Sequence, residues 1–220
     1  MIHLNPAEAR VLGVLIEKAL TTPEQYPLSL NALVAGCNQK SNRDPVLSMT
    51  EDETFDALES LRGKQLVVRV DVANSRVHRY KHMAGETLRA RTAEVAILAE
   101  LLLRGPQTMG ELRGRASRMH PLDSLDLVKD MLRALTERPE PLVRQVPPSP
   151  GSRAERFIQL LCPDLHRLDS PASAPSNAAA PPQPVVSPEL VGRLERLEDE
   201  VATLRKLVTR LAEALGVPAQ

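Results

Sequence analysis

The 220-residue sequence is poor in aromatic residues, cysteine and net charge, and each shortage excludes a class of protein. It has no Trp, two Phe and two Tyr, so its core must be built from aliphatic side chains. Two cysteines are too few for a disulfide framework and suit a reducing cytoplasm, where we expect the protein to reside. Acidic and basic residues number 28 each, which excludes a polycation drawn to nucleic acid by bulk charge. No apolar stretch approaches the ~20 residues of a membrane span.

The composition changes sharply after residue 162. Residues 163–188 contain seven prolines, many Ala and Ser, and no aromatic residue. Such a segment cannot bury enough apolar area to offset the entropy of ordering it, so a disordered Pro/Ala-rich linker is predicted.

Residues 189–216 follow a heptad pattern and are predicted to form a coiled-coil helix. The strict period of 3.5 residues favours a homodimer, and the alternative is a lone amphipathic helix that folds back onto the body. The dimerisation residues alternate at spacings of four and three: Leu190, Leu194, Leu197, Val201, Leu204, Val208, Leu211 and Leu215.

The first 162 residues contain one pattern twice, which predicts two domains, 1–86 and 87–162. Residues 7–15 match residues 93–101 at an offset of 86. Both segments carry apolar residues at helical spacing, so each is expected to open its domain with a helix.

Two further helices and a β-hairpin are expected in each copy. Ser29 and Thr108 are placed to cap two short second helices, and Thr50 with Glu53 forms a capping box for a third helix. The apolar residues that define the third helices are Phe55, Leu58 and Leu61, which we expect to be buried, and Leu125, Val128, Met131, Leu132 and Leu135. The hairpins are predicted over 66–80 and 142–160. This order predicts tandem winged helix-turn-helix domains, mainly α with small β-hairpin wings (α+β).

One long motif resembles a known family. Residues 21–33, TTPEQYPLSLNAL, and residues 37–45, CNQKSNRDP, are similar to the signature of the YceH-like family of uncharacterised bacterial proteins. Residues 104–113 resemble the second half of that family. The resemblance covers residues 1–162 and implies a tandem winged-helix fold, and it implies no reaction and no catalytic residues.

DNA binding is the default function of a winged helix, but the third helices do not suit it. The first one should expose a stripe of carboxylates, with Asp52, Asp56 and Glu59 at its centre and no basic residue between 51 and 61. Such a face repels phosphates, so an alternative function is a protein–protein interaction adaptor that uses this helix as its partner-binding surface.

Positive charge is concentrated elsewhere. The residues predicted to bind nucleic acid lie in the polar loop 38–45, in the first hairpin, and around the short second helix of the second copy: Lys40, Arg43, Arg76, Arg79, Lys81, Arg113, Arg115 and Arg118. One function is therefore a nucleic-acid-associated regulator that grips the backbone through basic wings. The alternative is a solvated surface of ordinary salt bridges. The polar loop 38–45 is read in the same two ways, as a phosphate or partner site or as local turn-making.

Enzyme chemistry finds little support. The five His residues show no metal-ligand spacing with Cys or carboxylates, and no phosphate-cradling Gly loop or nucleophile motif occurs. Cys37 is expected to be a small buried helix residue rather than a nucleophile. We therefore expect a non-enzymatic protein without metal or cofactor.

Overall fold

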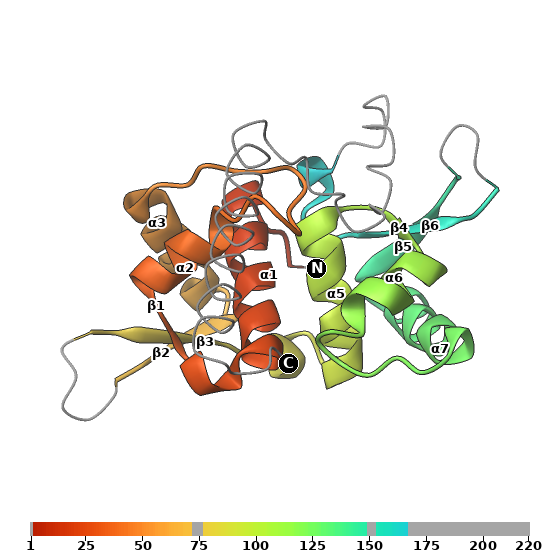
Figure 1. Cartoon of the computed structure of the whole chain (residues 1–220), viewed down its shortest axis with the longest axis horizontal. Coiled ribbons are helices and arrows are strands. Elements are labelled where there is room, and N and C mark those ends of the chain that lie inside the picture. Colours follow the sequence, from red (N-terminus) through yellow and green to blue (C-terminus); the bar gives the residue numbers. More distant parts are fainter. Residues whose placement is uncertain (1, 72–76, 149–152, 167–220) are drawn as a thin grey trace, which may run out of the picture. The chain divides into compact units, whose positions relative to one another are not determined.

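The computed structural model describes residues 2–71, 77–148 and 153–166, all of which belong to one compact unit. Its architecture is α+β, with two small antiparallel sheets among the helices. Figure 1 shows the elements of residues 1–86, here called the first repeat, beside those of residues 87–162, the second repeat.

The three main helices of the first repeat are α1 (Pro6–Thr21), α2 (Leu30–Cys37) and α3 (Glu51–Gly63). The last two begin after the capping residues that the sequence indicates, and α1 is capped by Asn5. Ser29 accepts a hydrogen bond from the Ala32 amide at the start of α2. Thr50 and Glu53 form the predicted reciprocal capping box at α3. A short 3-10 helix η1 (Pro23–Gln25) and the helix α4 (Ala84–Thr87) complete the first repeat.

The sheet of the first repeat has three antiparallel strands in the order β1-β3-β2. The predicted hairpin is formed by β2 (Val67–Val70) and β3 (Arg79–His82), and β1 (Leu28–Ser29) adds a strand on the other side of β3. Leu28 lies opposite Tyr80 in the register, and both side chains are buried. The short strand β1 thus ties the start of α2 to the hairpin.

The second repeat follows the same order. Its helices are α5 (Thr92–Arg104), α6 (Met109–Ala116) and α7 (Leu125–Thr136). Its strands β4 (Gln107–Thr108), β5 (Val143–Val146) and β6 (Arg156–Gln159) pair in the order β4-β6-β5. The described chain ends with the 3-10 helix η2 (Pro163–Leu165).

Helices α1 and α5 pack against each other in opposite directions and join the two repeats (Figure 1). All α1 residues from Glu8 to Glu17 and all α5 residues from Ala93 to Leu103 are buried. Gly13 allows the contact, because a Cβ at that position would lie 2.9 Å from Cδ2 of Leu103. One continuous cluster of buried apolar residues therefore runs through both repeats, centred on these two helices.

The third helix of the first repeat differs from expectation at one apolar position. Phe55, predicted to be buried, is 42% exposed. Thr54 and Ala57 instead join Leu58 and Leu61 on the buried face of α3. The prediction was wrong because the buried face of α3 runs through positions 54, 57, 58 and 61, and at 100° per residue Phe55 lies to one side of that face.

Candidate functional site

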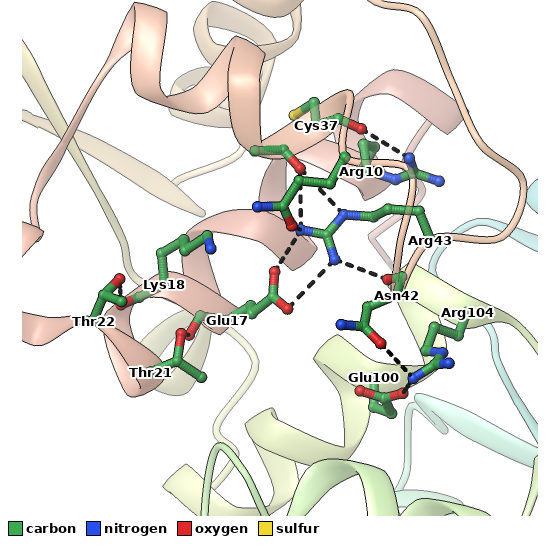
Figure 2. A network of polar contacts seen from close by, with 12 residues as sticks. Arg10, Glu17, Lys18, Thr21, Thr22, Cys37, Asn42, Arg43, Glu100 and Arg104 are labelled. Carbon is green, nitrogen blue, oxygen red and sulfur yellow. Dashed lines mark hydrogen bonds and ion pairs between the residues drawn. The ribbon is translucent and has the colours of Figure 1, made fainter. Parts of the chain in front are cut away.

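The polar loop that follows α2 is folded inward around Arg43. Its guanidinium is fully buried and forms an ion pair with the carboxylate of Glu17 on α1 at 2.5 Å. It also donates to the backbone carbonyl of Gly36, at 3.0 and 3.2 Å, and to the side chain of Gln39 at 2.8 Å (Figure 2). All of these acceptors belong to the first repeat, so Arg43 is a structural cation of the core.

Glu17 also links this cluster to the second repeat. Its other carboxylate oxygen accepts from Arg118, just after α6, and Arg118 donates in turn to Glu100 on α5 at 3.2 Å. Burial alone raises the pKa of Glu17, but the hydrogen bonds and charges of Arg43 and Arg118 outweigh burial and hold this pKa below its ordinary value. Glu17 is therefore an ionised carboxylate shared by two arginines, at the junction of the repeats.

The tip of the loop is fixed to α5 by two more contacts. Arg104 donates to the side-chain oxygen of Asn42 at 3.0 Å (Figure 2), and the amide of Asp44 donates to the carbonyl of Leu103 at 2.8 Å. The guanidinium of Arg10, buried within α1, donates to the carbonyls of Cys37 and Pro45. The loop therefore contacts both α1 and α5 and holds them together. Its inward polar groups are not available to a phosphate.

Four of the eight basic residues named from the sequence already contact other groups of the protein. Arg79 donates to the carbonyl of Pro27 at 2.9 Å, and Arg115 donates to Gln107 at 2.9 Å and pairs with Glu111 at 3.4 Å. Arg43 and Arg118 belong to the network around Glu17. Arg76 lies outside the described residues.

Lys40, Lys81 and Arg113 are exposed, and none of the three forms an ion pair with a carboxylate of the described residues. They lie on three different elements: the loop after α2, strand β3 and helix α6. The structure therefore leaves three free cations of the eight, and it gathers four of the others into contacts within the body.

The acidic face of α3 is exposed as expected. Asp52, Asp56 and Glu59 face solvent together with Glu51 and Glu53, and Phe55 lies exposed among them. Glu59 forms an ion pair with Arg62 at 2.6 Å, one turn further along the helix. The helix thus carries an exposed aromatic residue surrounded by carboxylates. The sequence analysis missed this combination because it assigned Phe55 to the core.

Helix α7 provides an internal comparison for α3. The capping residues Thr50 and Ser124 correspond at an offset of 74, and the buried residues follow at the same offset, Thr54, Ala57, Leu58 and Leu61 against Val128, Met131, Leu132 and Leu135. At this offset Phe55 corresponds to Lys129 and Glu59 corresponds to Arg133. The aromatic ring and three of the five carboxylates of α3 therefore have no counterpart on α7, which keeps only Asp126 and Asp130.

Both cysteines are free and buried, as predicted for Cys37, and burial raises the pKa of Cys37 to about 12. Among the described residues no group of three or more His, Cys, Asp or Glu is arranged to hold a metal ion. No described helix is both long enough and apolar enough to cross a membrane. The eight heptad residues from Leu190 to Leu215 lie outside the described residues.

Comparison with known proteins places the chain in a family. A family model described as "Protein of unknown function, DUF480" matches residues 4–152, and the chain belongs to this family. This confirms the resemblance to an uncharacterised bacterial family that the motif in residues 21–45 indicates.

Similar relatives carry the name UPF0502 protein. The protein from Geobacter sulfurreducens is 50% identical, over 92% of this chain and 90% of the relative. The protein from Geotalea daltonii is 48% identical, over 88% of each chain. The protein from Burkholderia vietnamiensis is 44% identical, over 98% of this chain and 90% of the relative. These names assign no activity.

Proposed function

We propose that this protein is a non-enzymatic adaptor of two tandem winged helix-turn-helix modules, and that α3 of the first module is its partner-binding surface. The order of three helices followed by a β-hairpin, present in each repeat, supports the winged-helix assignment. The observation that carries the functional proposal is the exposed face of α3, where Phe55 lies among five carboxylates.

The chemistry of that face favours a protein partner over duplex DNA. A winged helix that reads DNA places its third helix in the major groove, where charge neutralisation by Lys and Arg supplies most of the affinity. From Glu51 to Gly63, α3 has five acidic residues and one basic residue, Arg62, which pairs with Glu59. An exposed aromatic side chain is, in contrast, typical of protein-binding hot spots.

Nucleic-acid binding is a second proposal, supported by the three exposed cations Lys40, Lys81 and Arg113. In this proposal they contact phosphates without reading bases, so binding is tolerant of sequence and sensitive to salt. Titration of duplex binding against salt tests it. The absence of binding at low salt, or a log–log slope near zero, removes this proposal and leaves the adaptor.

We further propose that the protein acts in the cytoplasm as a homodimer joined through residues 189–216. The free cysteines Cys37 and Cys162 and the heptad pattern of the sequence support these two proposals. Dimerisation would present two α3 surfaces to a partner, which increases avidity without any new contact.

The adaptor proposal is tested by reversing the charge of α3 in the full chain. The variant Asp52→Lys, Asp56→Lys, Glu59→Lys should lose its specific partners in cross-linking and quantitative mass spectrometry from a native extract. The exposed positions permit the change without disturbing the core. Phe55→Ala should lose the same partners while it retains all charges.

Helix α7 supplies the matched control. Asp126→Lys with Asp130→Lys changes the two carboxylates that occupy the positions of Asp52 and Asp56 at the offset of 74. This control should retain the partners of the wild type. An unchanged partner set in the α3 variant, or an equal loss in both variants, would contradict the proposal.

A further inference from the structure

The last described residues of the chain form a strap that returns from the second repeat to the first. This strap, residues 161–166, leaves β6 and is fixed at its start by the amide of Leu4, which donates to the carbonyl of Leu161 at 2.7 Å. The side chain of Gln159 brackets Cys162 by bonding both its amide and its carbonyl, at 2.7 and 2.6 Å. Although composition assigns residues 163–166 to the linker, Leu165 and His166 are buried.

His166 holds the free end of the strap. Its Nε2 lies 2.6 Å from the carbonyl oxygen of Asp44 in the polar loop 38–45. A carbonyl only accepts, so Nε2 carries the hydrogen, and Nδ1 of the neutral ring carries a lone pair. The ring also lies over Gly105, where φ is +77° and a Cβ would come within 2.7 Å of Cδ2 of His166. The strap thus closes on the loop and on the end of α5.

The surroundings of the other ring nitrogen of His166, Nδ1, disfavour its protonation. Nδ1 is buried and has no hydrogen-bond partner among the described residues. Two charged groups influence the ring: Arg10 from α1, whose fully buried guanidinium is cationic, and Asp44 from the loop. Gly105, the residue that caps the end of α5, lies against the ring and carries no charge. A proton on Nδ1 would therefore place a second buried positive charge near Arg10, with no acceptor for the new N–H.

We propose that His166 is an acid-operated latch, in which protonation of Nδ1 detaches the strap from Asp44 and Gly105 while the two repeats stay folded. The repeats do not depend on this contact, because α1, α5 and the network around Glu17 join them elsewhere. The strap includes the first four residues of the predicted linker, and residues 167–188 of that linker follow it in the chain. Its release therefore adds six residues to the tether, or up to about 20 Å of reach.

The direction of the pH dependence follows from the environment of the ring. Burial lowers the pKa of His166 most, the hydrogen bond and charge of Asp44 raise it, and Arg10 lowers it, with a net result below the ordinary value of 6.5. The detached strap therefore binds the proton more tightly than the closed strap. The latch is fully closed above 6.5 and weakens as the pH falls below that value. At pH 5.5 its opening constant rises by up to about 10-fold.

Hydrogen exchange of the full chain at pH 7.5 and 5.5, corrected for the intrinsic exchange rates, tests the latch. Peptides over 156–166 should open up to about 10-fold more at the lower pH in the wild type, and peptides over α3 should not. His166→Gln keeps a donor near the position of Nε2 but does not titrate, so its strap should lose this response. His82→Gln, which removes another imidazole whose pKa lies below its ordinary value, should keep it.

Three results would overturn the latch: a strap that does not respond to pH in the wild type, a response that persists in His166→Gln, or simultaneous opening of α3. If His166→Gln is open at both pH values, NMR titration of the wild type decides. The strap amides must then titrate with the same midpoint as the His166 ring, and a different midpoint would also overturn the proposal.

Discussion

Glu17 is the residue at which we expect a single substitution to lower the free energy of unfolding most. Its side chain is 3% exposed, and it neutralises Arg43, whose side chain is 0% exposed. Glu17→Gln preserves the shape but removes the negative charge. The guanidinium of Arg43 is then left buried with only neutral acceptors, on Gly36, Gln39 and Asn42.

The expected loss is large because a buried ion pair is broken on one side only. Removing one partner of such a pair costs about 3–5 kcal/mol, mainly through the charge left without compensation. Arg118 suffers less, since its side chain is 31% exposed and it still reaches Glu100. With the Gln carbonyl as a residual acceptor, we expect about 3 kcal/mol, or a fall in Tm of roughly 6–12 °C for a body of this size.

Urea and thermal unfolding of the full chain, followed by circular dichroism, measure this loss. Glu59→Gln is the control, because its pair with Arg62 is half exposed and its removal should leave the midpoint unchanged. The double variant Glu17→Gln, Arg43→Gln should be more stable than the sum of the single losses predicts, since no charge is then orphaned. If the Glu17→Gln protein had the same urea and thermal midpoints as the wild type, the reasoning about the network would be refuted.

Three further predictions concern the contact between α1 and α5, a second imidazole and the C-terminal segment. Gly13→Val should destabilise the body by about 1–3 kcal/mol in urea, because its side chain must displace Leu103, whereas Gly114→Ala, with open space around it, should not. Burial lowers the pKa of His82 to about 4, so the free energy of unfolding should fall by roughly 3 kcal/mol in total as the pH drops from 6.5 to 4. His82→Gln should flatten that part of the pH profile, and an unchanged profile would exclude His82 as its cause. Deletion of 189–220 should convert dimers into monomers in sedimentation, and a truncated chain that still sediments as a dimer would place the interface in the body.

The sequence by itself determined the order of the elements, because the signals for them are local. Apolar spacing and capping residues such as Thr50 and Glu53 act within one or two helical turns, and the start of α3 confirms them. Burial of Cys37 and exposure of Asp52 and Asp56 likewise follow from helical periodicity. The short strand β1 was missed because two residues are too few to show the alternation of apolar and polar side chains that predicts a strand. Its pairing with β3 also depends on a partner some fifty positions away.

Only the tertiary structure decided which charged groups are free. Arg43 and Arg118 are like the other arginines in composition, yet both pair with Glu17, at sequence separations of 26 and 101 residues. Local patterns do not encode such pairings, since ion pairs are set by how whole helices pack. For the same reason the packing of α3 left Phe55 exposed to solvent, and the return of the strap placed His166 against the loop. The elements came from local chemistry, and the surfaces available to a partner came from the way α1 and α5 join the two repeats.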